Sequence, residues 1–297
     1  MPVSQSARVA EIGPADRGAL LSAAYRMLGT MADAEDAVQE AYVRLLRLDP
    51  AERDDIRSPA AWLMRTTARI CLDMLGSARA RRERYVGDWL PEPVPADHWP
   101  VGAQSDPVDV SARAESVSTA LLLMLETLTP AERVVLVLHD AFAMPYAEIA
   151  TVVDRTPAAC RQLGASARAQ VGSRRAVPVP AERHRAVVAA FSAAAATGRL
   201  EALVRALDPD VVLRSDGGGV VSAARRSVRG ADRVARFLLG IAAKHPTAAY
   251  EPVVHGDGEG ILVRVAGEVD AVVSFATDGE RVTEIWVVRN PEKLRLW

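Results

Sequence analysis

The chain has 297 residues, of which 49% are hydrophobic and 25% charged, and its formal net charge at pH 7 is −2. This composition is typical of two or three globular domains and excludes a largely disordered chain. No apolar stretch is long enough to span a bilayer, the N-terminus lacks the apolar core of a signal peptide, and two cysteines are too few for a disulfide framework, so we expect a cytoplasmic protein.

The small net charge conceals an uneven distribution of charge along the chain. Arginine supplies nearly all the positive charge, with six arginines between residues 65 and 84 and five between residues 155 and 175. Acidic side chains gather instead between residues 33 and 40. Charges of opposite sign on separate segments indicate different partners for different surfaces.

Residues 33–48 are predicted to form an amphipathic helix. Apolar side chains recur there at helical spacing, and Asp36, Glu40 and Arg44 follow one another at intervals of four on the opposite side. Glu40 precedes Arg44 in the order that favours an ion pair along a helix. The helix therefore has one apolar and one charged face.

Residues 59–75 are predicted to form a second helix. It begins at Ser58 and Pro59, a capping residue followed by proline in the first turn. Arg65 and Arg69 fall on its polar side, opposite an apolar stripe that we expect to be buried.

The segment 87–110 interrupts the helical pattern. Its run GDWLPEPVPADHWP contains four prolines, which cannot sustain a helix. The segment also carries Trp89, Leu90 and Trp99, so we expect this linker to pack on a neighbouring domain rather than to be fully solvated.

A second helical block follows between residues 111 and 176. Thr129 to Glu132 form a capping-box sequence with proline at the first helical position. Next come a short helix over 146–153, a tight turn and a new helix that begins at Thr156. The second helix carries arginine and glutamine on its outward face. This pair meets the requirements of a helix-turn-helix DNA reader, although an ordinary helical hairpin with a solvated arginine face also fits the segment.

The periodicity changes after residue 176. Helices are predicted near 182–197 and 199–207, and short β-branched runs follow, separated by the turn sequences DGGG, DGEG and DGE. The predicted strands are Val211–Arg214, Tyr250–His255, Ile261–Val265, Val269–Phe275 and Val282–Val288. Helices followed by a meander of strands indicate an α+β domain with a curved sheet.

Residues 125–171 resemble the domain of extracytoplasmic-function sigma factors of bacterial RNA polymerase that reads the promoter −35 element. Their sequence is LETLTPAERVVLVLHDAFAMPYAEIATVVDRTPAACRQLGASARAQV. Two earlier stretches are similar to other parts of the same family. The part that docks on the polymerase is matched by YRMLGTMADAEDAVQEAYVRLLR, and the part that reads and melts the −10 element is matched by IRSPAAWLMRTTARICLDMLGSARARRERY. The family usually has glycine between the two reader helices, where this chain has Asp154, a residue that tolerates a left-handed backbone.

The resemblance implies a set of residues for each surface. On the face that docks on the clamp helices of the polymerase β′ subunit it places Asp36, Gln39, Glu40 and Arg44. For −10 DNA it implies a flipped base seated by the loop 53–58 and cationic contacts from Arg65, Arg69, Arg79, Arg81 and Arg82. For −35 DNA it implies Arg155, Arg161, Gln162 and Arg168. Trp62 is expected to pack in the core rather than to stack on DNA.

The C-terminal part resembles the SnoaL-like extension of one subgroup of these sigma factors. The similar stretches are FSAAAATGRLEALVRALDPDVVLRSDGGG, RGADRVARFLLG and IWVVRNPEKLRLW, together with the linker motif WLPEP; Val220 stands where the subgroup commonly has lysine. The extension is implied to pack against the sigma domains and tune their activity in place of a separate anti-sigma protein. The implied regulatory contacts are Trp89, Asp216, Gly217, Gly218, Gly219, Asn290, Pro291 and Lys293.

These inferences predict a multidomain protein with two all-α domains, the second containing the helix-turn-helix, followed by a cone-shaped α+β domain of the SnoaL/NTF2-like kind. The expected limits are 1–86 for the polymerase- and −10-binding domain, 87–110 for the proline-rich linker, 111–176 for the −35-binding domain and 177–297 for the SnoaL-like domain.

The predicted function is that of an alternative sigma factor, which binds core RNA polymerase and promoter DNA and is modulated by its C-terminal domain. We expect no catalysis, no cofactor, no metal and no membrane partner, and a monomer when free. Two alternatives stay open: a DNA-binding regulator that never joins the polymerase, and a C-terminal domain that senses a small molecule or acts as a SnoaL-type enzyme. Residues available for such chemistry, without diagnostic spacing, are Asp216, Tyr250, His255 and Asp270.

Overall fold

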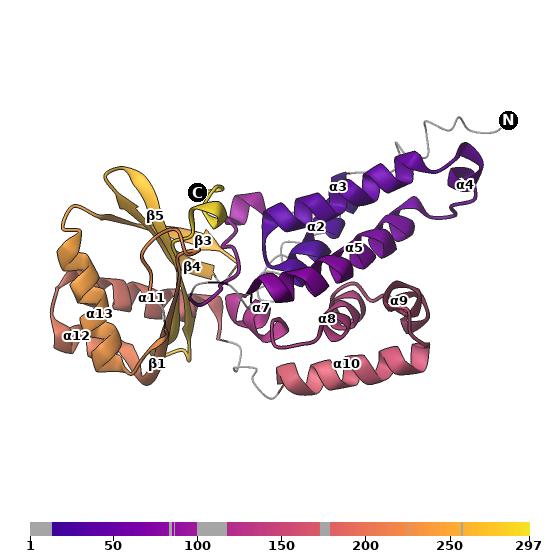
Figure 1. The fold of residues 1–297 in the computed structure, drawn as a ribbon. Helices are drawn as coiled ribbons and strands as arrows, with labels where there is room; N and C mark the ends of the chain where they lie inside the picture. The colour runs from indigo at the N-terminus through magenta and orange to yellow at the C-terminus, as the bar shows by residue number, and fades with distance from the viewer. Residues whose placement is uncertain are drawn as a thin grey trace. The chain divides into compact units, whose positions relative to one another are not determined.

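The computed structural model describes residues 14–82, 85, 87–99, 118–172, 179–224, 226–256 and 258–297, with the backbone alone for residues 14, 15 and 78–82. These residues form two compact units. The helical unit contains residues 14–81 and 121–172, and the sheet unit contains the described residues among 82–99, 118–120 and 179–297. Figure 1 shows helices alone in the first unit, and a curved sheet with helices in the second.

The helical unit has two parts, which we call segment A and segment B. Segment A contains α2 (Pro14–Leu28), α3 (Met31–Arg47), α4 (Pro50–Asp54) and α5 (Pro59–Arg82). Segment B contains α7 (Thr119–Leu125), α8 (Pro130–Leu136), the π-helical turn η2 (Val137–Ala141), α9 (Tyr146–Val153) and α10 (Pro157–Gly172).

Local sequence signals account for several helix ends, as predicted. The Thr129 hydroxyl accepts a hydrogen bond from the Glu132 amide at 3.3 Å, and the Glu132 carboxylate accepts one from the Thr129 amide at 3.0 Å, so the capping box is formed. Ser58 caps α5 by accepting from the amide of Ala61 at 3.3 Å. Asp154 ends α9 in the left-handed conformation, with φ of 52°.

The apolar stripe predicted for residues 33–48 is buried in segment A. Ala34, Ala37 and Ala41 of α3 have no exposed surface, and neither have Ala24 and Met27 of α2. The small alanine side chains let α2 and α3 approach closely, which leaves the charged side of α3 outward. The interior of segment A therefore determines which side of α3 a partner can reach.

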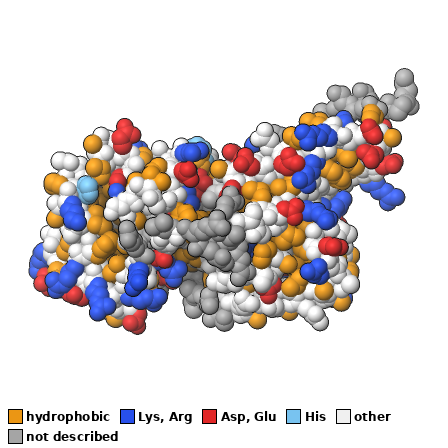
Figure 2. Space-filling view, in the orientation of Figure 1, with side chains coloured by type: hydrophobic (Ala, Val, Ile, Leu, Met, Phe, Trp, Pro, Cys, Tyr) orange, Lys and Arg blue, Asp and Glu red, His pale blue; other side chains and the backbone are white. Residues whose placement is uncertain are grey.

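The surface carries mixed charge. On the face drawn in Figure 2, basic and acidic side chains lie interspersed over the described residues of both units. No broad field of one sign covers this face.

The sheet unit contains six strands in the order β2-β1-β6-β5-β4-β3. The strands are β1 (Leu207–Asp216), β2 (Val228–Arg229), β3 (Ala249–His255), β4 (Gly258–Val265), β5 (Glu268–Thr277) and β6 (Val282–Val288). Strands β3 to β6 form an antiparallel meander, and β1 runs parallel to β6. The helices of this unit are α11 (Ala181–Ala196), α12 (Leu200–Ala206) and α13 (Ala231–Lys244).

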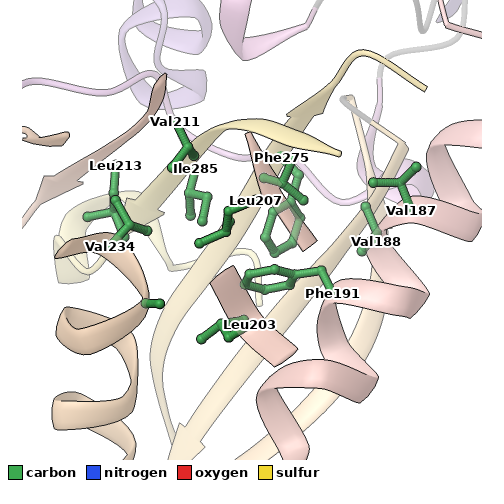
Figure 3. Close-up of a cluster of buried hydrophobic side chains, with 12 residues drawn as sticks. Val187, Val188, Phe191, Leu203, Leu207, Val211, Leu213, Val234, Phe275 and Ile285 are labelled. Atoms are coloured by element: carbon green, nitrogen blue, oxygen red, sulfur yellow. The ribbon is translucent and has the colours of Figure 1, made fainter. Parts of the chain in front are cut away.

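One face of the sheet packs on these three helices to form the core of the unit (Figure 3). Phe191 of α11, Leu203 of α12 and Val234 of α13 meet Phe275 of β5 and Ile285 of β6 there. The rings of Phe191 and Phe275 lie 5.1 Å apart, centroid to centroid, and are tilted by 58°. Helices on one face leave the opposite face to be covered by another part of the chain.

The linker covers that opposite side. Trp286 alternates with core residues along β6, so it points to the other face, yet it is only 1% exposed. Residues 90–95 of the linker are all buried. At the start of this stretch, the Leu90 amide donates a hydrogen bond to Asp216, at the end of β1. At its end, Pro95 forms a β-bridge with His255, at the end of β3. The linker therefore runs across this face of the sheet from β1 to β3.

The predicted fold class is confirmed, with helical segments followed by an α+β sheet domain. All five predicted strands are present, and β2, α13 and η2 are elements that we did not predict. Among the described residues, no helix has both the length and the hydropathy needed to cross a bilayer.

Candidate functional site

The charged face of α3 is accessible. Asp36, Gln39 and Arg44 are exposed and Glu40 is half-buried. Glu40 accepts a hydrogen bond from Arg44 Nε at 2.9 Å, the ion pair expected from their spacing. Beside this face, Leu46 is 58% exposed. Together these side chains form a mixed charged and apolar surface of the kind that binds protein.

The arginine face of α5 borders two open cavities. Arg65 lines both, a cavity of about 570 Å³ formed with the loop before Pro59 and one of about 290 Å³ formed with Arg44 and Arg69. The loop predicted to seat a flipped base lines the larger of these cavities. The side chains of Arg79, Arg81 and Arg82, which were predicted to contact −10 DNA, lie outside the described residues.

Trp62 differs from its expected role as a core residue. It is half-buried and lines both cavities, next to Arg65. Its place in the first turn of α5 explains the difference, because the neighbouring helix residue Leu63 takes the buried position with 0% exposure. An aromatic ring beside a cavity and an arginine can stack on an unpaired base.

Segment B contains the predicted helix-turn-helix, formed by α9 and α10. The two helices approach closely at Gly164, where a Cβ atom would lie 2.9 Å from the Tyr146 hydroxyl. On the outward side of α10, Arg161 and Gln162 are exposed. Arginine and glutamine are the side chains that pair with guanine and adenine edges in the major groove.

The other two arginines predicted to contact −35 DNA are exposed but already engaged. Arg168 donates to the Asp140 carboxylate at 2.9 Å and to the Tyr146 hydroxyl at 3.2 Å, which ties α10 to η2 and α9. Arg155 donates to the carbonyl of Asp154 at 2.8 Å. Arg168 thus holds parts of segment B together, whereas Arg161 is exposed on the outward side of α10.

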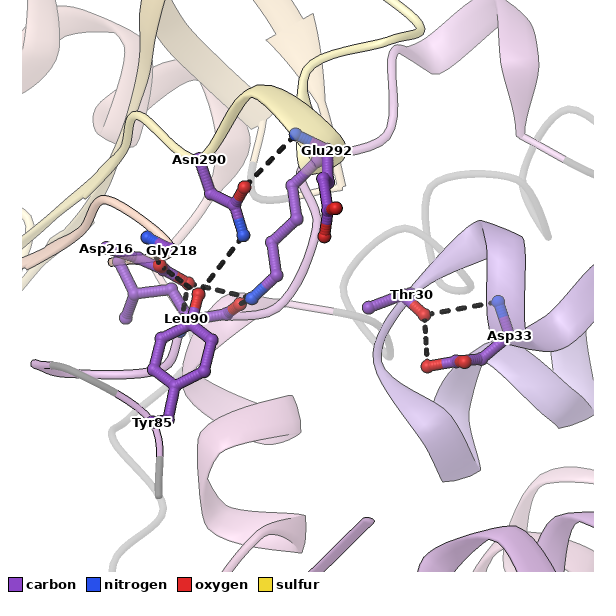
Figure 4. Close-up of polar contacts among 9 residues, drawn as sticks. Thr30, Asp33, Tyr85, Leu90, Asp216, Gly218, Asn290 and Glu292 are labelled. Carbon is purple, nitrogen blue, oxygen red and sulfur yellow. Dashed lines mark hydrogen bonds and ion pairs between the residues drawn. The ribbon is translucent and has the colours of Figure 1, made fainter. Parts of the chain in front are cut away.

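In the sheet unit, the Asp216 carboxylate holds the linker (Figure 4). It is completely buried, at the end of β1, and accepts hydrogen bonds from the Leu90 amide and the Gly218 amide, both at 2.9 Å. The Tyr85 hydroxyl also donates to it. Its charge is balanced by Lys293, whose Nζ lies 2.7 Å away.

Lys293 joins the tail of the chain to the linker. It is 5% exposed, donates to the carbonyl of Leu90 and lies over the ring of Trp89, 4.3 Å from the centroid. A buried ammonium needs both a counter-ion and hydrogen-bond acceptors, and it finds them on Asp216 and Leu90. We call Tyr85, Trp89, Leu90, Asp216, Asn290 and Lys293 the linker clamp.

The three glycines of the DGGG turn are required for different reasons: Gly218 by close packing against the tail, Gly217 by close packing within the turn, and Gly219 by its backbone conformation. Gly218 has φ of +66°, and a Cβ atom on it would lie 2.6 Å from the side chain of Asn290. A Cβ atom on Gly217 would lie 2.4 Å from the carbonyl of Val221, and Gly219 has φ of +73°. Only glycine accepts these positions without strain.

Asn290 and Pro291 form the tail side of the linker clamp. Asn290 Nδ2 donates to the Tyr85 hydroxyl at 3.1 Å, and its Oδ1 accepts from the Glu292 amide at 3.1 Å. Pro291 then begins a single 3₁₀ turn that brings Lys293 back toward Asp216. All the regulatory contacts implied by the resemblance lie in this part of the sheet unit.

Tyr85 and Trp297 are members of this site that sequence reasoning missed. Burial raises the pKa of Tyr85, and its hydrogen bond to Asp216 raises it further, so the phenol keeps its proton and remains a donor. Trp297 donates from Nε1 to the carbonyl of Pro93 at 2.8 Å. The only signals were aromatic residues at the edge of the linker and at the end of the chain.

The four residues considered for catalysis each have a structural setting of their own. Asp216 belongs to the linker clamp, and Asp270 forms a two-pronged ion pair with Arg289 at 2.6 and 3.1 Å. Tyr250 is 54% exposed on β3. Burial, and then the charge of Asp270, raise its pKa, which favours the neutral phenol. Among the described residues, no group of three His, Cys, Asp or Glu side chains could hold a metal ion.

The fourth of these residues, His255, is a buried neutral imidazole. It is 4% exposed, its Nε2 lies 3.2 Å from Ser274 Oγ, and a Cβ atom on Gly260 would lie 2.4 Å from the same nitrogen. Burial, and to a smaller extent the nearby His184, lower the pKa of His255 to about 4.

This depressed pKa predicts a loss of stability in acid. Because the unfolded chain protonates His255 near pH 6.5 and the native chain only near pH 4, its contribution is complete above pH 6.5 and is lost as the pH falls toward 4. We expect a decrease in the free energy of unfolding of roughly 3 kcal/mol over that window from this residue. Urea unfolding of wild type and His255→Gln between pH 7 and 4.5 tests it. Equal pH dependence in the two proteins would show that the imidazole contributes nothing.

Comparisons with known proteins agree with this architecture. Two family models match the chain, Sigma-70 region 2 over residues 15–81 and Sigma-70, region 4 over residues 118–171. The ECF RNA polymerase sigma factor SigJ of Mycobacterium tuberculosis is 39% identical over 295 residues, covering 92% of this chain and 89% of SigJ. The protein of the same species described as "Probable ECF RNA polymerase sigma factor SigI" is 38% identical over 296 residues, covering 98% of this chain and 97% of that protein.

The similarity extends to three dimensions. The crystal structure of Mycobacterium tuberculosis SigJ matches with a TM-score of 0.73 and 35% identity, over 96% of this chain and 98% of that one. Both the helical segments and the sheet unit take part in the match. The chain therefore belongs to the extracytoplasmic-function sigma factors of RNA polymerase.

Proposed function

We propose that this protein binds core RNA polymerase and directs it to specific promoters. The observation that carries the proposal is the outward pair Arg161 and Gln162 on α10, in a chain related to sigma factors over nearly its whole length. These two side chains are the ones whose hydrogen-bond geometry suits base edges in the major groove. The protein works in the cytoplasm and is a monomer when free.

Each remaining surface has its own part in this function. The face of α3 with Asp36, Gln39, Glu40 and Arg44 docks on the clamp helices of the β′ subunit. The arginine face of α5 holds the −10 single strand, with one extruded base in the cavity beside Trp62. Support for the second assignment comes from the larger cavity, where Arg57, Arg65 and the ring of Trp62 meet the loop before Pro59. The carboxylates of Glu52, Asp55 and Glu148 line the same cavity.

The sheet unit regulates initiation through the linker clamp. The linker joins segment A to segment B, so its free length determines how far apart the two DNA-reading surfaces can move. Holding residues 90–95 against the sheet shortens that length. The buried contacts of Asp216 and Lys293 support this role, because they attach the tail and the linker to one point.

Substitution of Arg161 tests the reading function directly. A promoter library randomised at the −35 element is transcribed by core polymerase with wild type or Arg161→Ala, and the run-off products are sequenced. We expect wild type to select a defined −35 sequence and the variant to lose preference at one base pair, by roughly 5- to 150-fold, the equivalent of about 1–3 kcal/mol.

Gln170→Ala is a control for a polar truncation on the same helix, since Gln170 is exposed but lies further from the N-terminus of the helix. The control should select the wild-type sequence. Failure of the wild type to select any promoter would refute the proposed function. Unchanged selection by Arg161→Ala would refute the role of Arg161 alone.

A further inference from the structure

On one side, α10 is held by the capping box of α8. Ser166 Oγ donates a hydrogen bond to Glu132 Oε1 at 2.7 Å, while Glu132 Oε2 accepts from the amide and the hydroxyl of Thr129. Burial raises the pKa of the Glu132 carboxyl, but the hydrogen bonds from Ser166 and Thr129 outweigh burial and hold the pKa below its usual value. The carboxylate therefore stays charged, and a charged acceptor strengthens the hydrogen bond from Ser166.

On its other side, α10 is held by η2 and α9. Arg168 donates to the Asp140 carboxylate at 2.9 Å and to the Tyr146 hydroxyl at 3.2 Å. Tyr146 is itself fixed between two neighbours. Its ring stacks on His139 with the centroids 4.0 Å apart, and its hydroxyl lies so close to Gly164 that a Cβ atom there would come within 2.9 Å. Arg168 is thus bound to a side chain that has little freedom to move.

The π-helical turn η2 and the loop after it give this second anchor a fixed shape. The Met144 amide donates to the carbonyl of Leu138 at 3.0 Å, and the Met144 carbonyl lies 3.0 Å from His139 Nδ1, so the loop folds back on η2. Ala143 has φ of 51°, a left-handed conformation that alanine keeps only where its surroundings impose it. The irregular backbone therefore holds His139 and Asp140 in place beside α10.

The two anchors lie on opposite sides of α10. Successive residues of an α-helix are about 100° apart around its axis, so Ser166 and Arg168 are separated by about 200°. The buried residues of the helix fall in the arc on one side of these anchors: Cys160, Gly164, Ala167 and Val171. Arg161 and Gln162 fall in the arc on the other side. The anchors therefore stand at the two borders of the surface that carries Arg161 and Gln162.

We propose that Ser166 and Arg168 are positioning residues for −35 reading, because their two anchors fix the rotation of α10 about its own axis. The proposal deepens the proposed function and rests on it for the roles of Arg161 and Gln162. A group about 6 Å from the axis of a helix moves by about 2 Å for every 20° of rotation. Hydrogen-bond distances vary by only about 0.5 Å, so such a rotation takes Arg161 off a base edge. Arg168 acts through η2 and α9 and makes no contact with DNA.

The two possible roles of Arg168 predict opposite effects of removing Asp140. If Arg168 positions α10, loss of Asp140 releases the helix and lowers base preference. If Arg168 binds a phosphate, Asp140 competes with DNA, and its loss strengthens binding. The side chains are 44% and 38% exposed, so solvent screens the pair and its contribution is small. An anchor cannot add more to base preference than it contributes to holding the helix.

Removal of either charge tests the second anchor in the holoenzyme. Full-length protein with Arg168→Gln, Asp140→Asn or both is assembled with core polymerase. Binding is measured to promoter fragments that carry the −35 element selected in the run-off experiment or a scrambled one. We expect each single variant to lose preference for the selected element by about two- to fivefold, although the two change the net charge in opposite directions. The double variant should lose no more than either single variant.

Salt dependence and matched substitutions provide the controls. On the scrambled fragment, Arg168→Gln should keep the salt dependence of wild type, whereas loss of a phosphate contact would reduce the slope of log affinity against log salt by about one. Asp232→Asn and Arg236→Gln make the same chemical changes in an exposed ion pair of α13. Both should keep the wild-type preference. Ser166→Ala tests the first anchor and should lower the preference as Arg168→Gln does.

Hydrogen exchange gives a measurement that does not depend on promoter reading. In the free full-length protein, the amides of α10 should exchange about two- to fivefold faster in Arg168→Gln, Asp140→Asn and Ser166→Ala than in wild type. The two α13 variants should leave the exchange of α10 unchanged.

The outcomes separate this proposal from the function on which it rests. If Asp140→Asn binds both fragments more tightly, or Arg168→Gln reduces the salt slope by one, Arg168 contacts DNA and the proposal is wrong. The proposal is equally wrong if the exchange of α10 is the same in every variant. If exchange rises in the three anchor variants while wild type selects no −35 element, the anchors are real and the proposed function is wrong.

Discussion

Replacing Lys293 by methionine is expected to destabilise the sheet unit by about 3–5 kcal/mol. The substitution keeps the volume of the side chain but removes its charge, so the Asp216 carboxylate is left buried without a counter-ion. It also removes the donor to the carbonyl of Leu90. Urea unfolding followed by tryptophan fluorescence measures the change, since Trp89 and Trp286 both lie in this unit.

The chain contains its own control for this experiment. Lys244 is the only other lysine in the sequence, and it is exposed at the end of α13. Lys244→Met makes the same chemical change in solvent and should alter stability by less than about 0.5 kcal/mol. Equal effects of the two substitutions would mean that the buried pair does not hold the linker.

A double substitution distinguishes an uncompensated charge from lost packing. Asp216→Asn removes the negative charge and keeps one oxygen, which can accept from the Leu90 amide or from the Gly218 amide but not from both, because these amides donate to different oxygens of the carboxylate. Combined with Lys293→Met, it should recover part of the stability that the single substitution loses. No recovery would show that the ammonium acts through its contacts with Leu90 and Trp89 rather than through charge.

Much of the helical unit could be predicted because its signals are local. The capping box at Thr129, the cap at Ser58 and the left-handed Asp154 each act within a few residues, so they can be read directly from the chain. The apolar stripe of α3 was equally clear, since its alanines recur at helical spacing. The same periodicity does not report which polar face a neighbouring segment covers, and the contact of Glu148 with Arg65 went unpredicted.

The linker clamp could not be derived from local patterns. Tyr85 and Asp216 are 131 residues apart in the chain, and Leu90 and Lys293 are 203 apart. Neither periodicity nor turn chemistry carries information over such separations, and only the resemblance to a known subgroup pointed to Asp216, Asn290 and Lys293. The π-helical turn at Val137–Ala141 was missed for another reason, since its sequence VLHDA contains no proline or glycine to mark it.

Reversing two charges on α3 is expected to abolish binding to core polymerase. Asp36 and Glu40 project from the side of α3 opposite Ala37 and Ala41, which are completely buried, so Asp36→Lys and Glu40→Lys leave the interior of segment A intact. The pair Glu40–Arg44 is lost, at a cost to the helix of about 0.2–0.5 kcal/mol. Like charges facing each other across an interface cost several kcal/mol, so we expect binding at least about 100-fold weaker.

The control for this prediction must carry the same change in net charge, because polymerase affinity depends on long-range electrostatics as well as on contacts. Glu201→Lys with Glu268→Lys satisfies that condition, since both carboxylates are exposed in the sheet unit. Dissociation constants are measured with labelled core polymerase at two salt concentrations. These measurements separate long-range attraction from direct contacts, because salt weakens the long-range attraction equally in the two double variants. If the α3 double variant binds as tightly as the control while thermal unfolding shows both to be folded, the carboxylates of α3 do not form the docking face.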